Sequence, residues 1–123
     1  MIYLGNAFSI SMLRYPRIGT PHAIRIERIS AREAGDCLRD HRFVSAYGHR
    51  DTACHLAKYL HLFVPVRRQA IELTAEDVLI VAKANVRRED YLLNRRLGPK
   101  WSFFRVTVID ETETEADDDQ GAC

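Results

Sequence analysis

The sequence lacks several features that would place it at once in a familiar class of proteins. No apolar run approaches the roughly 18 residues that a membrane-spanning helix needs, and the first residues lack the basic segment of a signal peptide. No HExxH pair, glycine-rich phosphate-binding loop or nucleophile elbow occurs. These absences favour a cytoplasmic protein that has no membrane partner.

Cysteine is scarce as well, with three residues in 123. None forms a CxxC pair, and their odd number argues against a disulfide framework. Cys37 and Cys54 fall on the apolar faces of expected helices, so we interpret both as small buried hydrophobic residues. Asp51 and His55 have the spacing of two metal ligands on one helix face, but Asp51 is explained more simply as a helix cap. We therefore expect no metal site.

The chain is almost neutral, with 18 basic and 17 acidic residues, but its charge is unevenly distributed. Residues 110–119 hold seven acidic residues and no lysine or arginine, so the rest of the chain is basic. A basic body suits a polyanionic partner; alternatively, the arginines only solvate the surface and the acidic tail keeps the protein soluble. We expect one domain over residues 1–110 and a disordered tail over residues 111–123.

Hydrophobic periodicity predicts an α/β (α+β) fold. Residues 22–28 alternate between apolar and polar side chains, as in a half-buried strand. Ser30 and Glu33 form a capping box for a first helix, and Asp51 or Thr52 can cap a second helix. Other strand-like segments are residues 1–4, 43–47, 69–73, 78–84 and 103–109. The pattern indicates a single domain with a mixed sheet of about five strands and two main helices packed on it.

Among the five histidines, His49 differs by its position in the chain. It follows Gly48 in the loop that leads into the second expected helix. Glycine lets the backbone approach a ligand closely, and the free amides and positive dipole at a helix start favour a phosphate group. A histidine in this place can donate a proton to the oxygen that leaves a phosphodiester. The alternative is a surface histidine next to a helix cap.

Two arginine pairs lie next to expected strands, Arg67-Arg68 and Arg87-Arg88. Guanidinium groups suit phosphate oxygens and can stabilise charge in a transition state. The alternative is that each pair is part of a solvated sheet edge, since charged edges deter aggregation. The second pair opens the segment 87–100, which periodicity leaves as either a loop or a short helix.

Two spaced segments carry a family resemblance. Residues 3–13 read YLGNAFSISML, and residues 43–53 read FVSAYGHRDTA. They resemble the amino terminus and the catalytic-histidine segment of the viral anti-CRISPR ring nucleases, small proteins of archaeal viruses with cellular and bacteriophage relatives. The order of the expected elements agrees with that family over residues 1–84 and again at the final strand.

The resemblance implies a metal-independent nuclease for cyclic tetra-adenylate, the second messenger of type III CRISPR defence. Members of the family are homodimers that hold the ring across their two-fold axis. Cutting the ring switches off the effectors that the ring activates. No cofactor is implied, because the 2′-hydroxyl next to the scissile phosphate is the nucleophile.

The resemblance also implies roles for residues of this chain. His49 matches the catalytic histidine and is expected to be the general acid, with Gly48 beside it at the ligand. Asn6 and Ser9 match the amino-terminal loop that touches the ligand, and we expect them to hydrogen-bond ribose or phosphate.

The implied arginine and carboxylate positions are less uniquely defined. Arg68 matches a family arginine that contacts the ring, and Arg67 is a one-place alternative. The family usually carries an Arg-Leu-Pro/Glu-Glu-Gly stretch after its fourth strand, whereas the corresponding stretch here has no following glycine. Arg87 as a ligand contact, with Glu89 or Asp90 as the assisting catalytic acid, can fill these roles.

Two other functions remain open from the sequence. A protein that keeps the dimeric pocket but cuts slowly would sequester the messenger, and the altered stretch after the fourth expected strand favours this reading. A small DNA-binding protein is suggested by the basic body alone. No helix-turn-helix or ribbon motif supports it and the acidic tail argues against it, so we expect no stable duplex nucleic acid partner.

Overall fold

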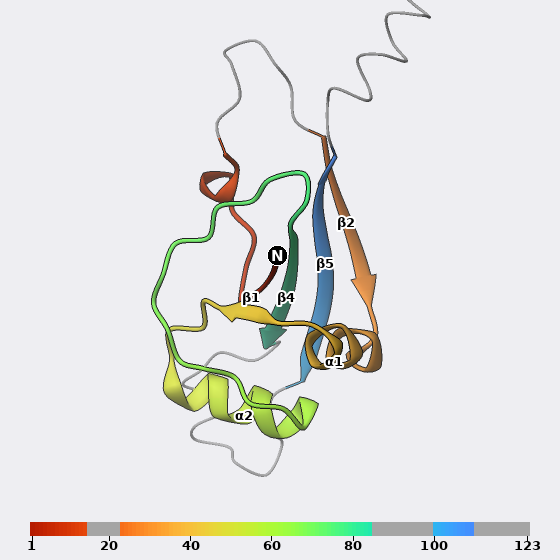
Figure 1. Ribbon diagram of the computed structural model, residues 1–123. Helices are drawn as coiled ribbons and strands as arrows, with labels where there is room; N and C mark the ends of the chain where they lie inside the picture. Colours follow the sequence, from red (N-terminus) through yellow and green to blue (C-terminus); the bar gives the residue numbers. More distant parts are fainter. Residues whose placement is uncertain (15–22, 85–99, 110–123) are drawn as a thin grey trace, which may run out of the picture.

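The computed structural model describes residues 1–14, 23–84 and 100–109 of the chain. These residues form one five-stranded sheet with the strand order β2-β5-β4-β1-β3, two α-helices and one short 3-10 helix (Figure 1). The strands are β1 (Ile2–Gly5), β2 (Ala23–Ile29), β3 (Phe43–Ser45), β4 (Val78–Ala84) and β5 (Trp101–Ile109). The helices are η1 (Ile10–Met12), α1 (Ala31–Asp40) and α2 (Arg50–Leu60). The predicted fold class, a mixed sheet with two main helices, is confirmed.

The strand directions give the sheet one edge at which several strands end. β1 pairs in parallel with both β3 and β4, whereas β5 is antiparallel to β4 and β2. β1, β3 and β4 therefore end at the same edge, which we call the carboxyl edge. β4 lies in the middle of the sheet because its residues 79–82 are all apolar and buried, which suits a strand covered on both faces.

Both α-helices cover one face of the sheet. Figure 1 shows α1 and α2 next to each other and well apart from η1. Ser30 is the N-cap residue of α1 as predicted, since its hydroxyl oxygen accepts a hydrogen bond from the Glu33 amide at 3.0 Å. The core under the helices contains, among others, Leu4, Leu38, Leu56, Leu60, Ile80 and Phe103.

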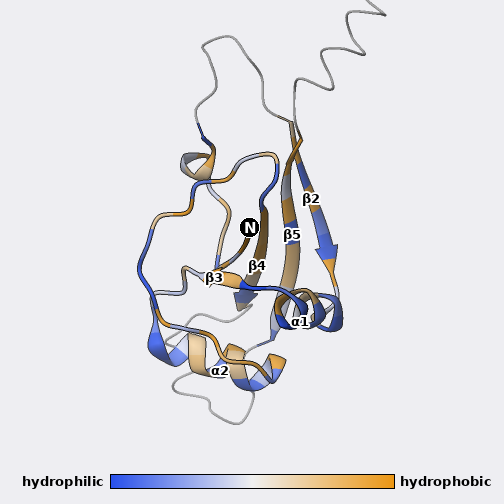
Figure 2. Ribbon diagram, viewed as in Figure 1, coloured by the Kyte–Doolittle hydropathy of each residue, from blue (hydrophilic) through white to orange (hydrophobic). Residues whose placement is uncertain are grey.

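The opposite face of the sheet, which we call the helix-free face, has no α-helix against it in the described part of the chain. η1 and residues 71–73 cover it only in part, and the Leu73 amide donates to the Met12 carbonyl at 2.6 Å. Figure 2 shows hydrophobic residues along β4 and β5. Ile26 of β2 lies on this face and is 58% exposed. The helix-free face is therefore an apolar surface that the described residues of one copy leave partly uncovered.

The start of α2 differs from the prediction. The helix begins at Arg50, and His49 is its N-cap residue, so neither Asp51 nor Thr52 caps it. The reason is that the His49 carbonyl already accepts the first helical hydrogen bond, from the Ala53 amide at 2.9 Å. The two polar residues fall inside the first turn instead.

Two other local predictions are wrong. Residues 69–73 form no strand. Among the described residues, the segment makes one isolated β-bridge, between Leu73 and Leu13. Cys54 is exposed, whereas Cys37 is half-buried and packs against the core. Cys54 follows the buried Ala53 by one residue, and a turn of about 100° per residue carries it off the apolar stripe of α2.

Some predictions fall outside the described residues. These are the acidic tail of residues 111–123 and nearly all of the segment 87–100. Within the described ranges, no helix is long and apolar enough to cross a membrane.

Candidate functional site

Two loops leave the sheet next to each other at the carboxyl edge. The loop after β1 begins at Asn6, and the loop after β3 leads to His49. The Ala46 amide donates to the Leu4 carbonyl at 2.8 Å, which continues the pairing of the two strands beyond the end of β3. Ligands of open α/β sheets bind outside the carboxyl ends of the strands. The topology therefore places both predicted loops where such a ligand would lie.

His49 stands at the amino-terminal end of α2 with an exposed side chain. Its backbone is extended (φ −116°, ψ 118°), and its imidazole makes no capping hydrogen bond to the helix. The first-turn amides and the positive end of the helix dipole lie next to it, while Asp51 adds a carboxylate to the same turn. An imidazole in this position can donate a proton to an anionic ligand bound at the helix start.

Residues 67–69, which we call the brace, run beside the loop that carries His49. Three hydrogen bonds join the brace to the loop. They run from Arg67 N to the Tyr47 carbonyl (2.8 Å), from Arg68 Nε to the Gly48 carbonyl (3.3 Å) and from Gln69 Nε2 to the Ser45 carbonyl (2.5 Å). Among these three bonds, Arg68 donates from its side chain to the residue before His49, whereas Arg67 donates from its backbone amide.

Gly48 allows a close approach within the protein, while its expected contact with a ligand stays a prediction. A Cβ atom built on Gly48 would lie 2.8 Å from Cγ of Arg68. The missing side chain therefore makes room for the aliphatic stem of Arg68, which can then reach the Gly48 carbonyl. Gly48 thus places an arginine beside His49.

Tyr47 is a residue that sequence reasoning missed. Its side chain is buried, and its hydroxyl donates to the carbonyl of Ala82 in β4. Burial raises the pKa of Tyr47 above its ordinary value, which keeps the hydroxyl protonated and able to donate. An aromatic residue directly before a Gly-His pair was the available signal, but its partner is 35 residues away.

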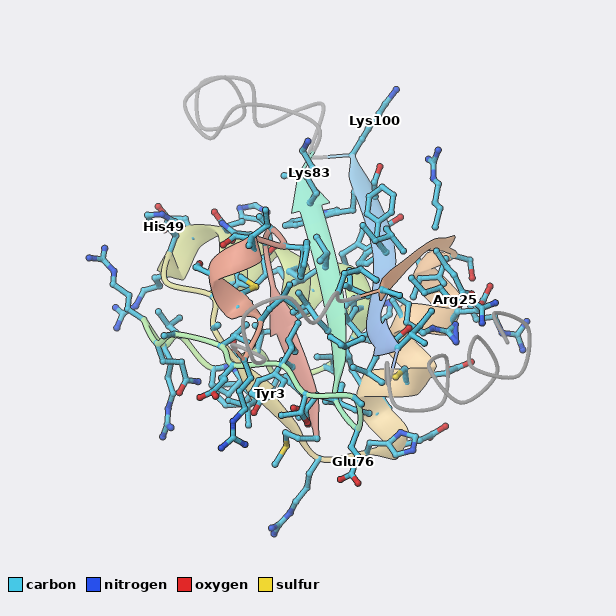
Figure 3. The ribbon with its side chains drawn as sticks, turned by 90° about the horizontal axis from the view of Figure 1, so that it is seen from above. Tyr3, Arg25, His49, Glu76, Lys83 and Lys100 are labelled. Atoms are coloured by element: carbon cyan, nitrogen blue, oxygen red, sulfur yellow. The ribbon has the colours of Figure 1, made fainter. Side chains whose placement is uncertain are left out.

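A hollow of about 310 Å³ opens on the helix-free face near the carboxyl edge. Its lining is mostly apolar, with Asn6 and Lys83 as the polar side chains. Figure 3 shows Lys83 and His49 toward one end of β4, with Tyr3 and Glu76 toward the other end. Sequence reasoning missed Lys83, for which the signal was a lysine near the end of an otherwise apolar strand.

The other predicted site residues are not brought to His49 by any described contact. Ser9 is the N-cap residue of η1, where its hydroxyl oxygen accepts from the Ser11 amide at 3.2 Å. Arg87 and Glu89, with the alternative Asp90, lie outside the described residues. In the described ranges no three His, Cys, Asp or Glu side chains gather to hold a metal ion.

Comparison with known proteins identifies the family. A family model described as STIV B116-like matches residues 2–97, which is more than half of the chain. The chain belongs to the STIV B116-like family. A solved structure, B116 of Sulfolobus turreted icosahedral virus (STIV), matches with a TM-score of 0.68 and 21% sequence identity. The match covers 86% of this chain and 97% of that chain. The search of proteins with curated descriptions returned no match.

The B116-like match includes the parts of the chain that form the carboxyl edge. Residues 2–97 contain the loop of Asn6, the loop of His49 and the brace. At 21% identity, the likeness to STIV B116 supports a shared fold alone. Function has to be argued from the side chains at the carboxyl edge.

Proposed function

We propose that this B116-like protein is a metal-independent ring nuclease that binds and cuts cyclic tetra-adenylate and thereby switches off type III CRISPR signalling. The observation that carries the proposal is the exposed imidazole of His49 at the start of α2, in a loop braced by Arg68. Residues 3–13 and 43–53, which resemble the ring nucleases, contribute the Asn6 loop and the His49 loop to the same edge.

The substrate supplies its own nucleophile in this reaction. The 2′-hydroxyl attacks the adjacent phosphorus in line with the 5′-oxygen and loses its proton to solvent, so the bond to O2′ forms while the bond to O5′ breaks. Protonated His49 donates its proton to the leaving 5′-oxygen. The Arg68 guanidinium and the first-turn amides of α2 stabilise the charge on the phosphorane. The products are linear oligoadenylates with a 2′,3′-cyclic phosphate at one end and a 5′-hydroxyl at the other.

The remaining site residues keep the roles that the resemblance implies. Asn6 and Ser9 hydrogen-bond the ribose or phosphate groups of the ring. Arg87 contacts the ligand, and Glu89 or Asp90 assists the proton transfer. These roles stay predictions.

The active unit of this proposal is a homodimer. A four-fold ring contains a two-fold axis, so a dimer of that symmetry presents the same groups to opposite phosphates. The helix-free face supports this arrangement, because Ile26 is 58% exposed there and Phe8 and Phe104 line an open hollow beside it. A second copy packed on this face covers these side chains and brings Asn6 and Lys83 of both copies to one shared edge.

Incubation with cyclic tetra-adenylate in the presence of EDTA tests the reaction. We expect linear products with a 2′,3′-cyclic phosphate from the wild-type protein. His49→Ala should lower the single-turnover rate by about 10²- to 10⁴-fold, the usual contribution of general acid catalysis, and should leave ring binding largely intact. His55→Ala, which removes another exposed histidine of α2, is the matched control and should cut at the wild-type rate.

The other outcomes separate the competing functions. An intact ring that co-elutes with the wild-type protein would identify a messenger sponge. Duplex DNA binding with a strong salt dependence, together with no binding of the ring, would identify a DNA-binding protein. Wild-type rates in His49→Ala would overturn the assignment of the general acid.

A further inference from the structure

Tyr47 connects the loop of His49 to the central strand of the sheet. Its side chain is 2% exposed and packs in the core under the helices, and its hydroxyl donates to the carbonyl of Ala82. The ladder between β1 and β4 ends at the pair Gly5 and Val81, so Ala82 is the first residue of β4 beyond it. The tyrosine hydroxyl therefore donates a hydrogen bond to a carbonyl of β4 that lies beyond the ladder with β1.

The backbone of Tyr47 is held as well. Its carbonyl accepts from the Arg67 amide at 2.8 Å, and its amide donates to the Ser45 hydroxyl oxygen at 3.3 Å. Only Gly48 separates this fixed residue from His49. The imidazole of His49 is exposed and makes no capping hydrogen bond, so its placement depends on the residues that precede it.

We propose that Tyr47 is a positioning residue for His49: its buried hydroxyl clamps the loop to the end of β4 and sets the place from which the imidazole donates its proton. This inference rests on the proposed ring-nuclease function. The clamp also ties the loop to the strand that carries Lys83, the residue after Ala82, so two polar groups of the carboxyl edge share one rigid support.

The substitution Tyr47→Phe removes the hydroxyl and keeps the ring that fills the core. The control is Tyr59→Phe in α2, where the tyrosine is 49% exposed and its ring stacks on Phe103 at 6.1 Å. We expect the single-turnover rate of Tyr47→Phe to fall by about 10- to 100-fold, the cost of a small misplacement of a reacting group. Its dissociation constant for the ring should stay at the wild-type value.

A second substrate separates positioning of the proton donor from a general structural role. A ring with sulfur in place of the scissile 5′-oxygen has a leaving group that departs as a thiolate and needs no proton. With this substrate, Tyr47→Phe and His49→Ala should both cut at nearly the wild-type rate. An equal loss of rate on both substrates would overturn the positioning role, and so would wild-type rates of Tyr47→Phe on the natural ring.

A readout that does not need activity tests the clamp itself. The Arg67 amide donates a hydrogen bond to the Tyr47 carbonyl. Hydrogen exchange of this amide with solvent should become faster in Tyr47→Phe and not in Tyr59→Phe. Unchanged exchange would overturn the clamp. If the wild-type protein cuts neither substrate, the ring-nuclease function falls, and the exchange rates still decide whether the hydroxyl holds the loop.

Discussion

Ile26 is the residue at which the proposed dimer interface can be tested most directly. It lies in β2 opposite Val106 of β5 and is 58% exposed, although Val106 itself is 1% exposed. The substitution Ile26→Ala removes apolar surface that lies outside the core of one copy. It should therefore weaken the association of two copies more than it lowers the free energy of unfolding of each.

The size of the effect follows from the exposed fraction. Full burial of an isoleucine side chain, relative to full exposure, contributes about 1.5–3 kcal/mol. The 58% of Ile26 that is still exposed therefore accounts for about 0.9–1.7 kcal/mol per copy. A two-fold interface buries Ile26 of both copies, so the total contribution to association is about 1.7–3.5 kcal/mol. At about 1.4 kcal/mol per factor of ten, the dimer dissociation constant should rise by up to about 20- to 300-fold.

Sedimentation over a concentration series measures this dissociation constant. The matched control is Ile109→Ala, because Ile109 is 41% exposed but points to the opposite face by the alternation of β5. The control should leave the dissociation constant unchanged. An unchanged value for Ile26→Ala, or an equal weakening by both substitutions, would refute the helix-free face as the interface.

Two further predictions concern binding and pH. Arg68→Ala should raise the dissociation constant for the ring by about tenfold or more, the value of one hydrogen bond to a charged group. Arg67→Ala should change this constant little, because Arg67 braces the loop through its backbone amide. Fluorescence titration of both variants measures the two constants, and equal losses of affinity would contradict the choice of Arg68. For Asp77, burial raises the pKa, but hydrogen bonds from Thr74 and the terminal ammonium outweigh it, so the folded-state pKa lies below 3.8. The contribution of Asp77 to stability is present above the unfolded-state pKa and is lost as the pH falls through the folded-state pKa. Asp77→Asn should therefore lose less stability than the wild-type protein when the pH falls below about 4. Denaturant unfolding between neutral and acid pH measures the free energy of unfolding, and an unchanged dependence of this free energy on pH would contradict the prediction.

The fold was predictable where burial and backbone pairing go together. The apolar run of β4 and the stripe of α2 bury their side chains within regular elements, so periodicity identified both. The prediction of a strand over residues 69–73 was wrong because Ile71 and Leu73 are buried against the helix-free face without strand pairing along the segment. Alternation reports which side chains are buried, and it does not report whether the backbone has a neighbouring strand.

The geometry of the candidate site was predictable only in its local part. His49 could be singled out because a Gly-His pair preceded a helical stripe, although cap propensity assigned the helix start to Asp51 or Thr52. The contacts that hold the His49 loop join distant segments, since Arg68 and Gly48 are 20 positions apart in the sequence. The partner of Tyr47 in β4 depends on the strand order, which no local pattern encodes.

The proposed chemistry asks for few functional groups and for accurate placement of each. The ring brings its nucleophile, so the protein has to orient the phosphate, stabilise the added charge and donate one proton. A short chain can meet these demands if the donor stands on a rigid support. Here the support is the end of β4, reached through the Tyr47 hydroxyl, together with the brace that holds the loop from its other side. Loosening the Tyr47 contact or the Gln69 contact should therefore reduce the rate of cutting before it reduces the affinity for the ring, whereas loss of the Arg68 side chain also weakens ring binding.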